Sequence, residues 1–237
     1  MKSTESTQEG YSGESGLAAI RCCAFLFDLD GVLIDSAPAV ERVWAQWAME
    51  HALDPDAVVS HAHGRPSLST VKRFLPDADH ALENREVERR EIEDVEGIVV
   101  LPGAVELLTS LPPHRWTIAT SCTRRLAEAR LRAAKLPIPP RIVTATDVAR
   151  GKPDPEPFLR AAAKLGFPAS ECVICEDVPA GILSGKAAGA RVVALRTTFS
   201  EAELRAAGAD FVVDSCADIS VTESDGSLLV HLKSVNV

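Results

Sequence analysis

Apolar, strand-like runs alternate with segments of helical period along most of this chain, and no other feature constrains its fold as strongly. Strands separated by helices in this way form a parallel sheet with helices on both faces. The sequence therefore predicts an α/β fold, a Rossmann-like doubly wound parallel sheet. After a first strand that begins at residue 24, the predicted strands are 115–120, 141–144, 171–175, 191–196 and 211–213, and the helices between them are 124–135, 156–165, 179–188 and 200–207.

One long stretch, residues 37–98, breaks the alternation because it contains helical periods only. We interpret it as an inserted small α-helical cap domain, which leaves a discontinuous core made of residues 20–36 and 99–237. Open α/β sheets bind ligands at the carboxyl ends of their strands, so a cap inserted after the first strand should lie over that site. Residues 1–19 begin with a stretch rich in Ser, Glu and Gly and are predicted to be a flexible tail.

The first predicted strand ends on two carboxylates, Asp28 and Asp30, followed by Gly31. Side chains alternate along a strand, so both carboxylates should point to the same side. Two carboxylates this close suit a divalent cation such as Mg²⁺, and they can divide nucleophilic and acid–base roles between them. For this motif alone, an Asp-rich turn without chemistry is the alternative.

Other predicted strands also lead into polar side chains. Ser121 follows the strand 115–120, a loop with Lys152 follows the strand 141–144, and the pair Glu176-Asp177 follows the strand 171–175. Each has an ordinary structural explanation, as a helix N-cap, a solvated lysine or an acidic helix start. Together, a hydroxyl, a lysine and two acidic pairs at one edge can align and stabilise a transferred phosphoryl group.

The composition limits the classes of partner. The 237 residues are 46% hydrophobic and 25% charged, with a net charge of −9, which argues against broad binding of nucleic acid or anionic membranes.

No apolar stretch approaches the length of a membrane span, and no signal segment is evident. We expect a cytoplasmic protein, a monomer or weak dimer, with its six cysteines reduced. The pair Cys172 and Cys175 lies in a strand-like run and is expected to be core rather than a redox or metal site.

Taken together, the strand-end motifs resemble those of the haloacid dehalogenase-like (HAD) hydrolase superfamily. The run 28–33 is similar to its first motif, Ser121 to its second, Lys152 to its third and Glu176-Asp177 to its fourth. The resemblance covers about residues 22–200, and the helical insertion is similar to the small helical cap of the family.

The resemblance implies a mechanism in which Asp28 attacks phosphorus and Asp30 serves as general acid and then general base. The dehalogenase branch lacks a second aspartate and needs no metal, so Asp30 favours phosphate chemistry. The implied Mg²⁺ ligands are Asp28, the carbonyl of Asp30 and Asp177, with Glu176 as a further ligand or a partner of one. The implied phosphate-binding residues are Ser121, Cys122 and Lys152.

Substrate choice should lie in the cap, where the turn 61–67 carries His63, Gly64 and Arg65. Arg65 can grip an anion or several hydroxyls through its planar fork, although an exposed polar turn is the structural alternative. This turn resembles that of HAD enzymes acting on small sugar and polyol phosphates, such as hexose phosphates, 2-deoxyglucose 6-phosphate and glycerol phosphate. We predict such a phosphatase, with His63, Gly64, Arg65 and Thr123 as specificity residues. No third ligand accompanies His61 and His63, so zinc is not expected.

Two other functions remain open at this point. β-Phosphoglucomutase shares the four motifs, but that mutase tends to carry a Ser-Lys-Asn cluster where this chain has Thr123, Arg124 and Arg125. A non-catalytic sugar-phosphate-binding regulator on the same fold is the third possibility. The complete set of catalytic residues counts against it.

Overall fold

The computed structural model describes residues 18–233, and its core is built around a five-stranded parallel sheet. The strand order is β5–β2–β6–β7–β8, and all four neighbouring pairs are parallel. The strands are β2 (Ala24–Phe27), β5 (Trp116–Ile118), β6 (Cys172–Glu176), β7 (Arg191–Leu195) and β8 (Phe211–Val213). The predicted α/β fold with a parallel sheet is confirmed.

Both faces of this sheet are buried. Along β2, Phe25 and Phe27 belong to one apolar cluster and Ala24 and Leu26 to another, because successive side chains point to opposite faces. The first cluster is covered by α5 (Ala104–Ser110) and α6 (Arg124–Ala133), and the second by α7 (Glu156–Leu165), α8 (Pro179–Ala187) and α9 (Glu201–Ala206). Helices on both faces make the sheet doubly wound, as predicted.

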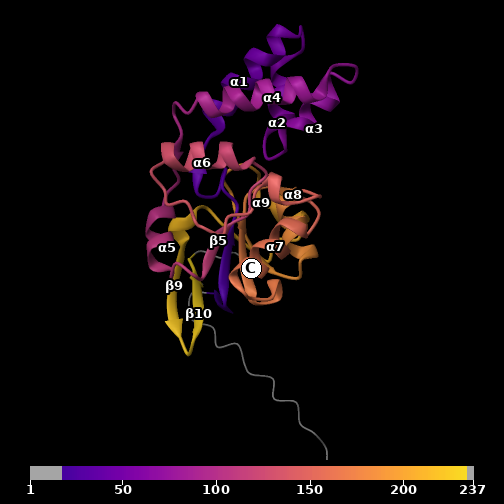
Figure 1. The fold of residues 1–237 in the computed structure, drawn as a ribbon. Coiled ribbons are helices and arrows are strands. Elements are labelled where there is room, and N and C mark those ends of the chain that lie inside the picture. The colour runs from indigo at the N-terminus through magenta and orange to yellow at the C-terminus, as the bar shows by residue number, and fades with distance from the viewer. Residues whose placement is uncertain (1–17, 234–237) are drawn as a thin grey trace, which may run out of the picture.

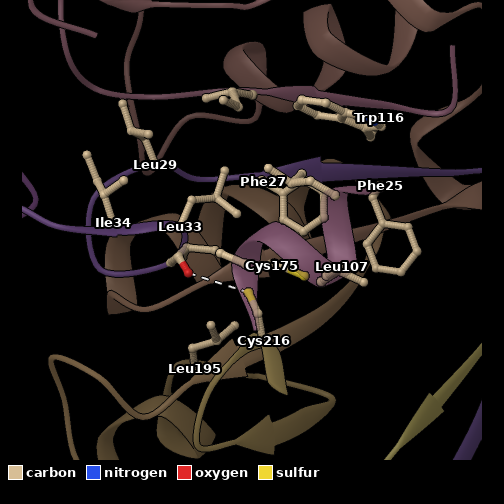
Figure 2. Packing of buried hydrophobic residues seen from close by; sticks show 14 of the residues in the cluster. Phe25, Phe27, Leu29, Leu33, Ile34, Leu107, Trp116, Cys175, Leu195 and Cys216 are labelled. Atoms are coloured by element: carbon tan, nitrogen blue, oxygen red, sulfur yellow. Dashed lines mark hydrogen bonds between the residues drawn. The ribbon is translucent and has the colours of Figure 1, made fainter. Parts of the chain in front are cut away.

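Phe25, Phe27 and Trp116 lie together within the first of these clusters (Figure 2). The rings of Phe25 and Phe27 stack with centroids 5.4 Å apart, and Trp116 meets Phe27 edge-on at 6.3 Å. Pairs in these geometries add stability beyond the area they bury, about 0.5–1.5 kcal/mol each. Asp28 directly follows Phe27, so this packing holds in place the end of β2 that carries the first carboxylate.

The two cysteines of the CxxC sequence are core residues, as expected. Cys172 and Cys175 are both buried on β6, but Cys172 packs in one apolar cluster and Cys175 in the other. Three residues apart on a strand, the two sulfurs point to opposite faces and cannot reach one another. Burial raises the pKa of Cys172 to about 12, so its thiol stays protonated.

Four consecutive helices form a third apolar cluster above the sheet, and we call them the cap helices. They are α1 (Ala37–Glu50), α2 (Pro55–Ala62), α3 (Ser67–Phe74) and α4 (His80–Glu93). Two of these helices begin with an N-cap side chain: Asp54 caps α2, and Asp79 accepts hydrogen bonds from the first amides of α4. Trp44 and Trp47 are the largest side chains of their shared core. None of the helices within residues 18–233 has the length and apolarity that crossing a membrane requires.

A short antiparallel ribbon joins the cap helices to the sheet. The chain leaves through β3 (Ile34–Asp35) and returns through β4 (Val99–Val100), with Ile34 paired to Val100 and Asp35 to Val99. Figure 1 shows α1–α4 gathered at one end of the molecule, next to α6 and far from β9 and β10.

The structure differs from the sequence prediction in two places. Residues 141–144 do not form a strand, and only a single bridge joins Val143 to Ala119. Pro139 and Pro140 precede this segment and lack backbone donors, while the short helix η1 (Ala145–Asp147) starts directly after it, so one residue is all that can pair.

The second difference is a three-stranded antiparallel sheet that was not expected. Its strands are β1 (Ala18–Cys22), β10 (Ser227–Leu232) and β9 (Ile219–Ser224), in that order. Ala18 and Ala19 therefore belong to a strand, paired with Leu232 and His231, rather than to the predicted tail. The rest of that tail, residues 1–17, lies outside the described residues.

Candidate active site

Side chains that follow β2, β5 and β6 meet at the carboxyl edge of the sheet. The backbone amide of Asp28 donates to the carbonyl of Cys175 at 2.9 Å, because Phe27 and Cys175 are opposite one another in the parallel pair β2–β6. Asp28 therefore lies beside Glu176, the last residue of β6. A cavity of about 830 Å³ opens over this edge, and Asp28, Asp30, Ser121, Lys152 and Asp177 all line it.

Lys152 connects the two acidic strand ends. Its Nζ lies 2.5 Å from Asp28 Oδ1 and 2.6 Å from Glu176 Oε1, and it also lies 4.9 Å above the ring of Phe158. The lysine side chain is only 3% exposed. Burial lowers the pKa of Lys152, but attraction to Asp28 and Glu176 outweighs burial and raises it above its ordinary value, so the ammonium is retained.

Burial has the opposite consequence for Asp28. Loss of water around the carboxylate, opposed by attraction to Lys152, raises the pKa of Asp28 to about 7. The neighbouring carboxylates of Glu176 and Asp30 contribute to this rise. A second cation beside Asp28 would favour its ionised form.

Glu176 is fully buried and both of its oxygens have partners. Oε1 accepts from Lys152, and Oε2 accepts from the backbone amides of Asp177 and Val178 at 2.9 and 3.1 Å. Gly181 of α8 makes room for this carboxylate, since a Cβ at that position would lie 1.7 Å from Oε1. With every oxygen engaged, Glu176 is suited to hold Lys152 and the loop of Asp177 in place.

Asp177 has an oxygen that no protein group satisfies. Oδ2 accepts a hydrogen bond from Thr198 at 2.5 Å, but Oδ1 is buried without a partner among the described residues. Gly31, with a φ of +79°, lies so close that a Cβ there would come within 2.0 Å of Oδ2. Burial, together with the charges of Glu176 and Asp28, raises the pKa of Asp177 well above its usual range.

These three acidic groups fit a bound divalent cation. Ligand oxygens of Asp28, Glu176 and Asp177 all lie within 4.8 Å of one another, in the one such group found among residues 18–233. Oxygen donors of this kind are the ligands that Mg²⁺ prefers. Buried carboxylates this close repel one another, and a divalent cation would offset that repulsion and satisfy Asp177 Oδ1.

Asp30 faces away from this acidic group and toward α6. Its Oδ1 accepts from Ser36 at 2.6 Å and from Arg130 at 2.9 Å, and its Oδ2 accepts from the thiol of Cys122 at 3.1 Å. Two carboxylates that are neighbours in sequence therefore have separate surroundings: Asp28 is paired with a lysine, and Asp30 with an arginine, a hydroxyl and a thiol.

Arg130 links Asp30 to the cap helices. It lies on α6 with a side chain only 6% exposed, and its second nitrogen donates to Glu91 of α4 at 3.2 Å. Burial raises the pKa of Glu91, and attraction to Arg130 opposes that rise. One buried cation thus holds a carboxylate on each side of the boundary between sheet and cap helices.

Ser121 and Cys122 occupy the turn between β5 and α6. The half-buried Ser121 lines the cavity, and its hydroxyl has no hydrogen bond to the described residues. The amide of Cys122 donates to the hydroxyl of Thr120 at 3.1 Å and its thiol faces Asp30, and its role in phosphate binding stays a prediction. Burial raises the pKa of the Cys122 thiol well above its usual range, so it remains a donor.

The predicted specificity residues lie around the mouth of the same cavity. The turn between α2 and α3 brings His63, Gly64 and Arg65 to it, and Thr123 approaches from the other side. Gly64, with a φ of +68°, lies against the loop after β6, since a Cβ there would come within 2.9 Å of Val178. His61 is turned into the cap helices, where its Nδ1 lies 3.2 Å from the hydroxyl of Thr70.

The family model for haloacid dehalogenase-like hydrolases matches residues 24–189. Hexitol phosphatase A of Escherichia coli is 42% identical over 90% of this chain and 100% of its own length. Glycerol-1-phosphate phosphohydrolase 1 of Saccharomyces cerevisiae is 36% identical over 86% of this chain and 87% of its own. The chain belongs to the haloacid dehalogenase-like hydrolase family.

Solved structures agree with this assignment. A hydrolase from Pseudomonas syringae, 32% identical, superimposes with a TM-score of 0.74 over 83% of this chain and 95% of its own. The β-phosphoglucomutase of Clostridium difficile, at 22% identity, gives a TM-score of 0.72 and shares the fold. The sequence resemblance to this hydrolase family is therefore confirmed.

Several residues at the site were not identified from the sequence: Ser36, Glu88, Glu91, Arg130 and Thr198. The sequence does hold a signal for Arg130, which lies three and four positions after Ala127 and Leu126, on the apolar face of α6. A charged residue on such a face needs a buried partner, and that requirement singles out Arg130.

Proposed function

We propose that this chain is a Mg²⁺-dependent phosphatase that hydrolyses small phosphorylated sugars or polyols through an aspartyl-phosphate. The observation that carries the proposal is the group Asp28, Lys152 and Asp177 at the floor of the cavity, with Asp30 two residues from Asp28 in separate surroundings. A nucleophile, a cation for the phosphate and a proton carrier are thereby in one place.

In the first step, an oxygen of Asp28 attacks phosphorus while the bond from phosphorus to the sugar oxygen breaks. Asp30, protonated at this stage, gives its proton to the leaving oxygen and becomes ionised. Hydrogen bonds from Ser36, Cys122 and Arg130 hold the Asp30 carboxylate in place. Lys152 and the unengaged hydroxyl of Ser121 hold the phosphate oxygens.

In the second step, Asp30 takes a proton from a water molecule as that water attacks phosphorus. The bond between phosphorus and the Asp28 oxygen then breaks, which releases inorganic phosphate and restores both aspartates. The transferred group is anionic, and the surrounding carboxylates would repel it without cations nearby. Lys152 supplies one positive charge.

Asp28 and Asp177 would hold Mg²⁺ directly, together with the carbonyl of Asp30. Glu176 would support them, since its oxygens are occupied by Lys152 and by backbone amides. The unsatisfied Oδ1 of Asp177 supports this arrangement. When bound, the metal offsets the charge of the phosphoryl group and of the acidic residues around it.

The substrate class rests on the relatives and the cavity. Hexitol phosphatase A and glycerol-1-phosphate phosphohydrolase 1 have names that specify phosphorylated polyols. A cavity of about 830 Å³ accommodates a molecule of that size. We assign the discrimination among such substrates to His63, Gly64, Arg65 and Thr123 at its mouth.

The two arginines that could hold a second phosphate are engaged or turned away, which favours a phosphatase over a mutase. Arg124 donates to Asp147 and to the carbonyl of Ile142 at 2.9 and 3.2 Å. Arg125 is exposed and does not line the cavity. A non-catalytic regulator is the remaining alternative, and turnover decides it.

We further propose that residues 37–98 act as a cap domain over a core made of 20–36 and 99–237. The site lies between the two parts, so motion of one against the other would admit substrate and exclude water. We also propose that the enzyme acts in the cytoplasm as a monomer or weak dimer. Its six free cysteines suit a reducing compartment.

The test is Asp28→Asn, assayed for phosphate release from glucitol 6-phosphate and glycerol 1-phosphate with Mg²⁺. We expect kcat to fall at least about a thousandfold with little change in the melting temperature. Asp79→Asn is the matched control, because asparagine caps α4 as well as aspartate does. Near-normal turnover by Asp28→Asn would overturn the mechanism. Activity in the unmodified enzyme that chelation removes would exclude a regulator.

A further inference from the structure

The cap side of the active-site cavity is lined by carboxylates. Glu41 comes from α1, and Glu88 and Glu91 come from α4. The apolar ring of Trp44 lies among them. In a cavity that receives a phosphate ester, the part of the substrate beyond the phosphoryl group must face these acids.

Few cations balance these acids. The lysines and arginines that line the cavity are Arg65, Arg130 and Lys152. Arg130 is shared between Asp30 and Glu91, and Lys152 between Asp28 and Glu176, so each of them already faces two carboxylates. Arg65 has no ion pair among residues 18–233 and is exposed at the mouth.

Glu88 is held in position at this surface. The hydroxyl of Thr123 donates to Glu88 Oε1 at 2.5 Å, which joins α4 to the start of α6. Glu88 is half-buried, and it is not paired with any lysine or arginine of the described chain. Its negative charge is therefore directed at the space above the phosphate site, and Thr123 is engaged in holding it rather than free to bind a second phosphate.

We infer that this cavity selects phosphomonoesters whose leaving group is neutral or cationic, and that Glu88 is the main residue that rejects a second anionic group. The inference rests on the proposed phosphatase function and narrows its substrate class. The hydroxyls of a sugar or polyol can donate to these carboxylates, and an amine can pair with them. A carboxylate or a second phosphate in the same space would be repelled. A phosphosugar mutase must bind a bisphosphate, so the negative charge of Glu88 disfavours mutase activity.

The experiment compares kcat/KM for four substrates of similar size. They are glucitol 6-phosphate, glucosamine 6-phosphate, 6-phosphogluconate and glucose 1,6-bisphosphate. We expect the first two to agree within about tenfold, and the last two to be at least about a hundredfold poorer than glucitol 6-phosphate, since juxtaposed like charges are strongly unfavourable. Higher salt should reduce the difference, because it screens the repulsion.

Glu88→Gln tests the residue itself. The amide keeps the size of the side chain and can still accept from Thr123, so the ratio of kcat/KM between glucitol 6-phosphate and 6-phosphogluconate should fall at least about tenfold. Glu93→Gln removes the same charge from an exposed position of α4 that does not line the cavity, and should leave the ratio unchanged.

The outcomes separate this inference from the proposed function. Equal kcat/KM for glucitol 6-phosphate and 6-phosphogluconate would overturn the inference alone, and so would an unchanged ratio in Glu88→Gln. Conversion of β-glucose 1-phosphate to glucose 6-phosphate, primed by glucose 1,6-bisphosphate and without net release of phosphate, would overturn it in favour of a mutase. No phosphate release from any of the four substrates would overturn the proposed function, and the inference with it.

Discussion

The residues at the floor of the cavity differ from those at its mouth in burial and in the pairing of their charges. At the floor, Asp28, Lys152 and Glu176 are at most 10% exposed and joined by contacts of 2.5 and 2.6 Å. At the mouth, Gly64 and Arg65 are exposed, and Arg65 has no ion pair among the described residues. Buried charged side chains are fixed in one arrangement, because any other arrangement would leave a buried ion unpaired. An exposed turn can change its conformation or sequence with little loss of stability. Chemistry should therefore be sensitive to single substitutions at the floor, and substrate preference to those at the mouth.

The largest effect is expected from Lys152→Met, which keeps most of the length of the side chain and removes its charge. Two buried carboxylates lose their shared cation, which costs about 3–5 kcal/mol of stability, and the phosphate loses its lysine. Phosphate release should fall at least about a thousandfold. Urea unfolding without metal and steady-state kinetics with Mg²⁺ measure the two effects.

Lys186→Met is the control for that variant. Lys186 lies 2.6 Å from Asp210 but is 36% exposed, so its loss should cost at most about 1 kcal/mol and leave kcat unchanged. Equal stability of the two variants would show that burial does not set the energetics of the floor.

Gly181→Ala should have the next largest effect, on activity rather than on stability alone. The new Cβ would lie 1.7 Å from Glu176 Oε1, so the carboxylate must move and release its hold on Lys152. We expect kcat to fall about a hundredfold, as expected when a catalytic group is displaced by about 1 Å.

Gly185→Ala provides the comparison within the same helix. Its Cβ would come within 2.8 Å of Val192 and 3.0 Å of Ile174, so it strains the apolar core without reaching Glu176. This variant should lose about 1–3 kcal/mol of stability and retain the kcat of the unmodified enzyme. A comparable kcat in the two glycine variants would contradict the role given to Glu176.

Arg130→Met breaks the connection between floor and cap helices. Glu91 would be left buried without its cation, at a cost of about 3 kcal/mol, and Asp30 would lose one of its donors. We expect kcat to fall about tenfold, and adding Glu91→Gln should recover stability but not kcat. Arg132→Met, on the exposed side of the same helix, should change stability by less than about 0.5 kcal/mol. Recovery of kcat by the double substitution would argue against a role for Arg130 in positioning Asp30.

The residues at the floor of the site could be predicted from the sequence, because their positions follow from where neighbouring strands end. Strands of a parallel sheet end at one edge, so Asp28, Ser121 and Glu176 had to lie near one another once the strands were recognised. Arg130 and Glu91 could not be found in that way. They are 39 positions apart on different helices, and their contact depends on how α4 packs against α6.

The errors in the fold have equally specific causes. The predicted strand 141–144 reflects β-branched composition, while the prolines before it limit pairing to one bridge. The hairpin of β9 and β10 was missed although Asp225-Gly226 provides its turn, with φ of +50° and +73°. Asp-Gly between alternating apolar residues is a strong hairpin signal, but a hairpin does not fit the strand–helix alternation of the rest of the chain.

The smallest effect is a dependence of Mg²⁺ affinity on pH, which should come from the floor of the cavity. Burial raises the pKa of Asp28 to about 7, and the metal binds the ionised carboxylate, so below pH 7 a proton must be displaced. Apparent affinity should therefore fall about fivefold between pH 7 and pH 6 and change little above pH 8.

The raised pKa of Asp28 also determines the direction in which folding stability changes with pH. Without metal, Asp28 has a higher pKa in the folded protein than in the unfolded chain, so its contribution to stability is lost as pH rises from about 4 through 7. Stabilisation by Mg²⁺ should accordingly grow over that range. Thermal melting at a series of Mg²⁺ concentrations and pH values measures both trends. In Asp28→Asn the slope should flatten, because the remaining amide does not titrate; an unchanged slope would mean that the proton is displaced from another group.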